Sequence, residues 1–327
     1  MPEAQFQASW NSRQHRETGA QFATYLQSYL NADRLASDEA QQLLSWAWQL
    51  GQLDACVQVA RHWLASEQLT EAEVIAVEAR VAACLIRLGN LSDAEAGLQR
   101  MLSQHSAHSH DKLAEAGYAH LQLGNAQRYL GYSEDAHEAF SKALESAETT
   151  RDGGLAIAAH TALGELALDN LQLEQAIESL GKGLGLTEFF RDKRLTIAPL
   201  AALAHAHALW KNPNKSYDLV SRALSRAQPS VDRVGSARAK FASATAALTR
   251  APKVPDVAHS FADAYDDASV APHLPLALRI ATSALEQQAQ GKHVPGMKLE
   301  ANKVLEQLQT CNMLPQLAKL SAVIEGS

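Results

Sequence analysis

The sequence is poor in several features, and each shortage excludes a class of protein. Its 327 residues include three cysteines, Cys56, Cys84 and Cys311, which are widely spaced and form no CxxC pair. Cys56 and Cys84 fall within apolar helical patterns, so we expect buried structural thiols there and neither a disulfide framework nor a cysteine metal site in the sequence. No run of about 18 apolar residues occurs, and the polar segment 1–19 lacks the apolar core of a secretory signal. These absences predict a soluble cytoplasmic protein without a membrane partner.

Positive charge and catalytic motifs are also scarce. Acidic residues outnumber Lys and Arg by 36 to 29, which gives a net charge of −7, and the basic residues are scattered along the chain. Proteins that bind nucleic-acid phosphates carry a patch of clustered basic residues, and this sequence has no such cluster. We therefore predict no direct nucleic-acid partner. The GxSxG, HExxH, GxxxxGK[ST] and GxGxxG arrangements are missing from the sequence. The sequence therefore predicts a protein that is not an enzyme.

Proline is distributed unevenly. After Pro2 the next proline is Pro199, and the other eight all follow it. Because proline cannot continue the interior of a helix, the C-terminal third is expected to have shorter helices and more irregular connections. In this part the apolar pattern predicts paired helices over 232–250 with 256–268 and over 274–290 with 295–309.

Good helix formers dominate the chain, and their apolar residues recur at helical spacing in blocks of about 12 to 16 residues. Similar turns separate the blocks. Gly51, Gly89 and Gly131 lie at such turns, 38 and 42 residues apart, and related turns follow at Leu171 and Lys211 after steps of 40 residues. A period near 40 that joins two helices is typical of an α-solenoid.

The predicted fold class is therefore all-α, a right-handed α-α superhelix of about six to seven antiparallel helix pairs. Such a solenoid needs a cap at each end, because a terminal repeat cannot bury its apolar face alone. We expect one cap at 314–324 and the other in an amphipathic helix over 13–30, which carries on one side Phe22, Leu26, Tyr29 and Leu30.

The repeats resemble the tetratricopeptide repeat (TPR) family in a long-period bacterial form of about 40 residues. The best match spans 117–150, and the positions that carry it are Leu123, Gly124, Gly131, Ala136, Phe140, Ala143 and Leu144. Other family positions differ, since His120 and Gln127 replace aromatic residues and Glu148 replaces the terminal proline. The physical logic of the match is that Gly124 and Ala136 let two helices approach while Phe140 fills the adjoining space.

The resemblance divides the chain into three parts. Residues 1–35 are expected to form a polar tail and a capping helix, and 36–230 to form the TPR-like repeats. Residues 231–327 are expected to contain degenerate helical repeats and a C-terminal capping helix. Whether this last part curls back onto the groove is left open.

The resemblance also implies a ligand site, because the family binds peptide segments in the concave groove of its superhelix. The candidate groove residues are Trp48, Tyr118, Leu121, Asn125, Arg128, Thr161, Glu165 and His205. For each of them an ordinary solvated helix face remains the alternative. His205 has a second alternative, a hydrogen-bonded structural role, and Arg128 could pair with one acidic side chain or phosphate.

Three tryptophans lie close together in the sequence. Trp46 and Trp63 are expected to pack between helices near the N-terminal end. Trp48 is a candidate exposed anchor, the kind of aromatic residue that dominates interface energies when it fills a partner's pocket.

Two functions fit these features. The first is a non-catalytic adaptor that holds a protein or peptide in the concave groove. The second is a signal-sensing module for a peptide or small ligand, with its output domain on another polypeptide. We predict no cofactor and no metal site, and we interpret His105, His108 and His110 as part of a solvated loop. Formation of a homo-oligomer is left open.

Overall fold

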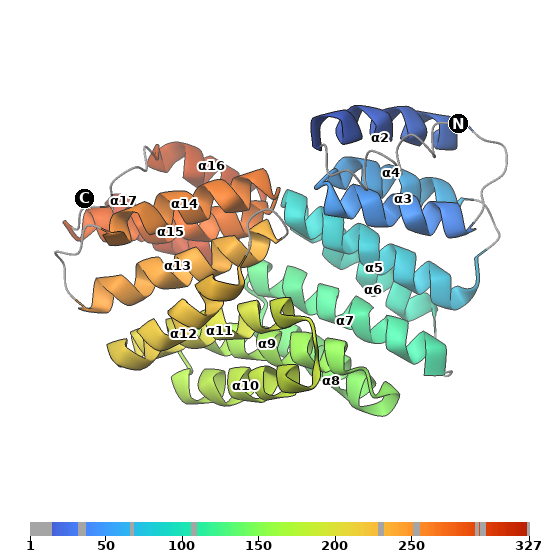
Figure 1. The fold of residues 1–327 in the computed structure, drawn as a ribbon. Helices are drawn as coiled ribbons and strands as arrows, with labels where there is room; N and C mark the ends of the chain where they lie inside the picture. The colour runs from blue at the N-terminus through green and yellow to red at the C-terminus, as the bar shows by residue number, and fades with distance from the viewer. Residues whose placement is uncertain are drawn as a thin grey trace.

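The structure is a computed structural model, and it describes residues 15–31, 37–65, 69–105, 110–227, 232–250, 256–291, 294 and 299–325. These ranges contain sixteen α-helices and no strand (Figure 1). The first eight are α2 (His15–Leu30), α3 (Ser37–Gln49), α4 (Leu53–Leu64), α5 (Glu71–Leu88), α6 (Leu91–Gln104), α7 (His110–Leu130), α8 (Ser133–Thr150) and α9 (Gly153–Asp169).

The remaining helices begin with α10 (Leu173–Leu186), and two short 3-10 turns, η1 (Thr187–Phe189) and η2 (Lys193–Thr196), follow it. The last seven are α11 (Ile197–Leu209), α12 (Pro213–Arg226), α13 (Arg233–Arg250), α14 (Asp256–Val270), α15 (Leu274–Ala289), α16 (Ala301–Thr310) and α17 (Leu314–Glu325). Across the described ranges, no helix combines the length and the apolar composition that crossing a membrane requires.

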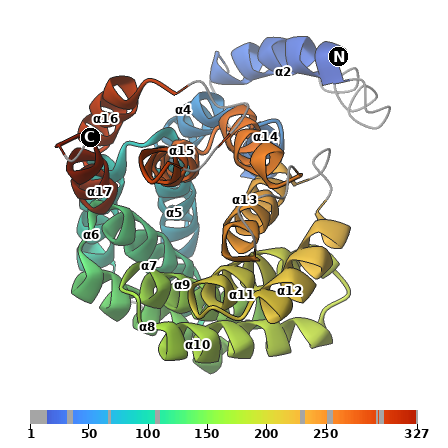
Figure 2. The same cartoon turned by 90° about the vertical axis from the view of Figure 1, so that its left-hand side faces the viewer.

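Consecutive helices pack as antiparallel pairs, from α3 with α4 to α13 with α14. The first helices of successive pairs contact one another, α5 with α7, α7 with α9, α9 with α11 and α11 with α13. Figure 2 shows these helices lining the inside of the curve, with α6, α8, α10 and α12 outside them. The predicted all-α superhelix of paired helices is therefore confirmed.

The turns within the pairs have the conformation that the sequence predicts. Gly51, Gly89 and Gly131 have φ of 70°, 90° and 93°, in the left-handed region that glycine enters without the steric cost of a side chain. Leu171 and Lys211 occupy the equivalent turns and also have positive φ, 58° and 56°. The chain therefore repeats one turn geometry even where the sequence has no glycine, at a cost of about 1–2 kcal/mol for each side chain.

The close helix approach predicted for the best repeat is also present. A Cβ atom added to Gly124 would lie 2.5 Å from the ring of Phe140, so a side chain at this position would collide with that ring. Phe140 and Ala136 are both fully buried. Helices α7 and α8 therefore pack at a distance that only glycine allows at position 124.

The N-terminal helix α2 covers the first pair, as predicted. Phe22 and Tyr29 are buried in one cluster with Trp46 and Trp63, and Leu26 and Leu30 pack against it. The prediction that both of these tryptophans lie between helices is confirmed, since they are 5% and 2% exposed. Helix α2 thus covers apolar surface that the first repeat would otherwise expose.

The C-terminal third turns back onto the earlier repeats. Leu278, Leu308 and Leu320 share one buried core with Leu91 and Leu130. Helix α15 packs on α5, and α17 packs on α7 (Figure 2). The sequence leaves open whether residues 231–327 curl back onto the earlier repeats. In the structure they do, and they pack against the repeat pairs α5–α6 and α7–α8. The three-part division of the chain at residues 35 and 230 stays a prediction.

Polar contacts reinforce this closure. The Nε atom of Arg87 in α5 donates to the carbonyl oxygen of Pro272 at 3.3 Å, in the turn between α14 and α15. Asn312, in the turn before α17, donates through Nδ2 to the hydroxyl of Ser92 at 3.2 Å.

The helices predicted over 232–309 are found at nearly those bounds, except that the last begins later, at Ala301, and residues 295–298 lie outside the described ranges.

Candidate functional site

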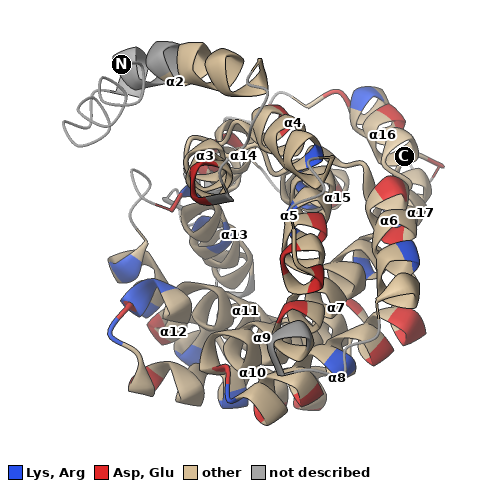
Figure 3. Cartoon of the chain, turned by 90° about the vertical axis from the view of Figure 1, so that its right-hand side faces the viewer, with Lys and Arg blue, Asp and Glu red and all other residues tan. Residues whose placement is uncertain are grey.

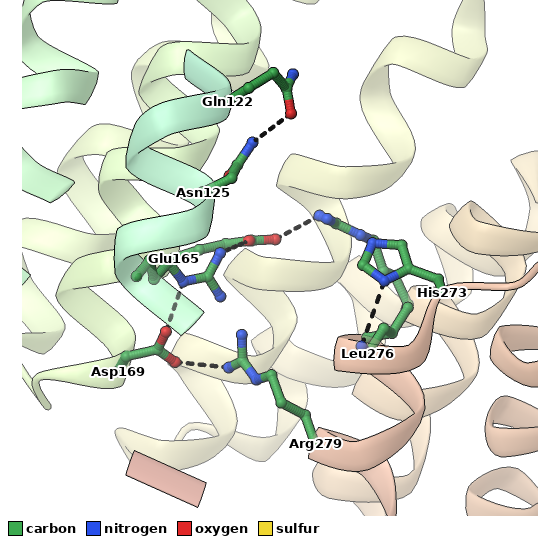
Figure 4. Close-up of polar contacts among 9 residues, drawn as sticks. Gln122, Asn125, Glu165, Asp169, His273, Leu276 and Arg279 are labelled. Carbon is green, nitrogen blue, oxygen red and sulfur yellow. Dashed lines mark hydrogen bonds and ion pairs between the residues drawn. The ribbon is translucent and has the colours of Figure 1, made fainter. Parts of the chain in front are cut away.

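Charged side chains gather on the inner side of the curve, where four helices meet. Arg128 comes from α7, Glu165 and Asp169 from α9, Arg238 from α13 and Arg279 from α15. We call these five residues the charge cluster, and Figure 4 shows its ion pairs. Positions 165 and 169 are four residues apart, so one face of α9 presents both carboxylates.

Each carboxylate of the cluster bridges two arginines. Glu165 accepts from Nη1 of Arg128 and, at 2.5 Å, from Nη1 of Arg238. Asp169 accepts from Nε of Arg128 at 2.6 Å and from Nη2 of Arg279 at 2.6 Å. Arg128 lies at the centre, since it pairs with both acids and its side chain is only 2% exposed. The cluster therefore ties α7 and α9 to two helices of the C-terminal third.

The cluster carries one more positive than negative charge. Burial alone would raise the pKa of Glu165, but Arg238 and Arg128 outweigh burial and lower that pKa to about 2. Burial likewise opposes ionisation of Asp169, yet Arg128 and Arg279 hold its pKa below the usual range. Both acids are therefore ionised at neutral pH. Three guanidinium groups face two carboxylates, so the net charge is one positive unit.

A small cavity of about 50 Å³ opens beside the cluster. Arg128, Glu165, Arg238 and Arg279 contribute its charged wall, and the rest of its lining includes His205, Phe241 and several alanines. Burial, followed by the nearby Arg279, lowers the pKa of His205 to about 4, so its imidazole is neutral at pH 7. The cavity thus combines fixed cationic donors, a neutral imidazole and apolar surface.

Three of the predicted groove residues line the cavity, and the others do not. Arg128, Glu165 and His205 line the cavity. Asn125 is partly exposed, and its amide donates to Gln122 at 3.4 Å. Tyr118 is 37% exposed and donates its hydroxyl to Asp152 at 2.9 Å, so it contacts the start of α9 and not the cluster.

Leu121 and Thr161 occupy a different environment from the one predicted. They are 7% and 6% exposed, and Leu121 belongs to the core between α7, α8 and α9. The Thr161 hydroxyl donates to the carbonyl of Ile157 one turn earlier in its own helix, at 2.7 Å. Their burial corrects the expectation that these two side chains face a ligand, because Leu121 packs into the core with α8 and α9, and Thr161 lies against Gly183 of α10.

Trp48 is not an exposed anchor, and that prediction is wrong. Its ring is partly buried and contacts two guanidinium groups, with Cζ of Arg80 at 5.1 Å and Cζ of Arg87 at 4.6 Å from the ring centroid. Cation–π contacts of this kind hold the indole against α5. Trp48 therefore has a structural role near the closure of the superhelix.

Sequence reasoning missed three members of the cluster. Asp169 lies four residues after Glu165, and this spacing was a usable signal. Arg238 and Arg279 belong to the C-terminal third, and their carboxylate partners are 73 and 110 positions earlier in the chain. No local pattern reports contacts at such separations, so only the closed superhelix reveals them.

A larger hollow of about 420 Å³ lies on the outer side, between α8 and α10. Its rim is formed by polar residues at the helix surface, among them Ser133, Glu134 and His137, over a floor that includes Leu163 and Leu166. None of the described residues in its lining contributes a buried carboxylate, since Glu134 is exposed. We therefore favour the smaller inner cavity, whose charged groups have already lost most of their hydration.

His273, in the turn between α14 and α15, is expected to make the stability of the chain depend on pH. Its Nδ1 atom caps α15 by accepting a hydrogen bond from the backbone N–H of Leu276 at 3.4 Å. Burial, followed by Arg238, lowers the pKa of His273 to about 3. In the unfolded chain the pKa of this histidine is near 6.5, so between about pH 6.5 and pH 3 the unfolded chain binds a proton that the folded chain does not bind. The free energy of unfolding therefore falls as the pH drops through this range.

Replacing His273 by Asn is expected to flatten this pH dependence. Asparagine can still cap α15 but does not titrate. Between pH 7 and pH 5 the native chain should lose about 2 kcal/mol of unfolding free energy more than the His273→Asn variant loses. Denaturant unfolding at both pH values measures the difference, with His137→Asn on the exposed outer surface as the control. Equal pH profiles for the native chain and His273→Asn would contradict this role.

Solved structures with similar folds were found, although no protein-family model matches this chain and its sequence has no significant match among curated proteins. One is the crystal structure of a Rap protein complexed with competence and sporulation factor, at 10% identity and a TM-score of 0.59, covering 99% of this chain and 97% of that one. Another is the Rap conjugation gene regulator of plasmid pLS20 in complex with the Phr* peptide, at 12% identity and a TM-score of 0.60, covering 98% and 95%.

A third similar structure is the apo form of RapI, at 13% identity and a TM-score of 0.55, covering 88% of this chain and 98% of that one. At these low identities the likeness establishes the fold and not the function. The TPR-like helical superhelix is supported, and membership of the TPR family itself stays a prediction.

Proposed function

We propose that this chain is a non-catalytic peptide-binding module that holds its ligand against the inner helices α7, α9, α11, α13 and α15. The observation that carries the proposal is the charge cluster beside an open cavity on the inner side of the superhelix. Two of the similar Rap structures are complexes, one with the Phr* peptide and one with competence and sporulation factor. These likenesses support the proposal through the fold alone.

The make-up of the cavity supports a binding role over a catalytic one. Among the described residues that line it there is no Ser, Thr, Cys or Lys to act as a nucleophile. Glu165, the acid in its lining, is fixed in ion pairs with two arginines that lower its pKa to about 2, so this carboxyl group is a poor proton donor or acceptor near pH 7. Arginine and carboxylate pairs instead provide oriented hydrogen bonds for recognition.

The other properties stay predictions from the sequence. In the view of Figure 3, Lys and Arg are spread over several helices and interspersed with Asp and Glu, which favours a protein or peptide ligand over nucleic acid. A cytoplasmic location and the absence of a membrane partner, a cofactor and a metal also remain predictions, and self-association is open.

Selection from a random peptide library on the immobilised full chain tests this proposal. We expect peptides to be enriched and to lose affinity at least about tenfold in Asn125→Trp, because the bulky ring would obstruct the inner side near the cluster. Gln175→Trp, on the outer hollow, is the matched control and should bind as the native chain does. Failure to enrich any peptide, or equal loss in both variants, would refute binding on the inner side.

A second candidate, a signal-sensing regulatory module, is favoured by the way the cluster joins α9 to α13 and α15. A ligand that alters these ion pairs changes how the C-terminal third closes on the earlier repeats. Small-angle scattering with a selected peptide separates the two candidates. A change in radius of gyration favours the sensor, whereas an unchanged curve favours the rigid adaptor.

A further inference from the structure

We propose that Arg238 and Arg279 form an anion subsite that binds one carboxylate group of the peptide ligand inside the cavity. This inference rests on the proposed function and specifies the chemistry that the ligand must carry. It concerns two arginines of the C-terminal third, which enter the inner site only because the superhelix closes.

The net positive charge of the cluster favours an anionic ligand. Among the described residues, Arg128, Arg238 and Arg279 form ion pairs with Glu165 and Asp169 alone, so the cluster keeps one positive charge that its own carboxylates do not balance. His205 adds no charge at neutral pH. A bound carboxylate would bring the cluster to neutrality, whereas a bound ammonium group would double the excess positive charge in a partly desolvated site.

The exposure of the three arginines tells which of them a ligand can reach. The Arg128 side chain is 2% exposed and already uses Nε and Nη1 on two acids. The side chains of Arg238 and Arg279 are 25% and 18% exposed, and each uses one guanidinium nitrogen in its ion pair, Nη1 and Nη2 respectively. A guanidinium has five N–H donors on three nitrogens, so both side chains have further donors to offer. Arg128 therefore holds the acids in place, while the other two are available to a ligand.

The size of the cavity fits a small group. A volume of about 50 Å³ exceeds the roughly 10–15 Å³ that a single water needs but is too small for a large side chain. A carboxylate at the end of a peptide, or on an aspartate or glutamate side chain, matches both this size and the fork geometry of guanidinium donors. The rest of the peptide would then lie along the inner helices outside the cavity.

The two resident carboxylates compete with such a ligand. Asp169 accepts from Arg279 and Glu165 accepts from Arg238, so the negative charge of each acid opposes a second carboxylate at the same guanidinium group. Neutralising Asp169 removes a competitor while Glu165 and Arg128 stay paired. Asp169→Asn is therefore expected to strengthen binding of a carboxylate, whereas Arg279→Gln weakens it. A purely structural role of the cluster would make both changes weaken binding.

Three synthetic hexapeptide pools with acetylated N-termini test this inference on the immobilised full chain. The first has a free C-terminal carboxylate and no acidic residue, the second is amidated and contains one glutamate, and the third is amidated without acidic residues. Retention is measured on the native chain, Arg279→Gln, Arg238→Gln, Asp169→Asn and the surface control Arg222→Gln, with folding of each variant checked by circular dichroism.

We expect at least one carboxylate pool to be retained about tenfold more than the neutral pool, as charge-assisted hydrogen bonds would provide. That preference should fall about tenfold in Arg279→Gln and Arg238→Gln, rise in Asp169→Asn and stay unchanged in Arg222→Gln. Whichever acidic pool is retained identifies the source of the carboxylate. Equal retention of the neutral pool would overturn the anion subsite alone, whereas retention of no pool would overturn the proposed function as well.

Discussion

Arg128→Met is expected to lower the free energy of unfolding by about 3–5 kcal/mol, because breaking a buried ion pair leaves its partner charges uncompensated. Arg128 is the one member of the cluster that pairs with both Glu165 and Asp169, and its side chain is almost completely buried. Methionine fills much of the same volume, so the loss reports charge more than packing. Chemical denaturation followed by circular dichroism measures the change.

Arg222→Met provides the matched control. Arg222 makes an exposed pair with Asp218, one turn away on α12, with side chains that are 44% and 60% exposed. Pairs of this kind contribute little, so we expect a change within about 0.5 kcal/mol. An equally small effect for Arg128→Met would mean that the cluster does not hold α7 and α9 together, and it would remove the basis for treating Arg128 as a structural member of the site.

Gly89→Ala is the second change with a large expected effect, a loss of about 3 kcal/mol from backbone strain and overpacking together. Gly89 has φ of 90°, and an added Cβ would lie 2.6 Å from Sγ of Cys311 and 2.9 Å from Cδ2 of Leu274. Both of those residues belong to the C-terminal third. The substitution therefore presses directly on the contact that closes the superhelix, and thermal or denaturant unfolding measures the cost.

Gly291→Ala separates the two contributions to that loss. Gly291 also has positive φ, 75°, but an added Cβ would meet nothing within 4 Å. We expect this control to lose only the strain, about 1 kcal/mol. Combining Gly89→Ala with Cys311→Ala should cost less than the sum of the two single changes, because the smaller side chain relieves the collision. Equal losses for Gly89→Ala and Gly291→Ala would argue that the C-terminal third does not press against this turn.

The helices and their turns could be predicted from the sequence because they follow from local chemistry. The glycines at the turns have the left-handed φ that ends a helix, and Phe140 packs against Gly124 as the repeat pattern predicts. The predicted N-terminal cap and the buried Trp46 and Trp63 were also found. Periodic apolar residues and glycines identify such features without knowledge of distant contacts.

The candidate site could be predicted only in part. Arg128, Glu165 and His205 were named because the repeat pattern places them on first helices that line the inner side. Arg238 and Arg279 could not be named, since their place depends on how far the superhelix curves before its C-terminal third meets the earlier repeats. The same closure explains Trp48, whose ring lies against Arg87, the residue that also bonds to the turn before α15.

A crystal structure of the full chain with its tightest selected peptide would show directly whether the inner side of the superhelix binds the peptide. We expect a peptide lying along the inner helices, with a carboxylate within hydrogen-bonding distance of Arg238 and Arg279. A peptide seated in the outer hollow between α8 and α10, or on the turns at the edge of the superhelix, would contradict it.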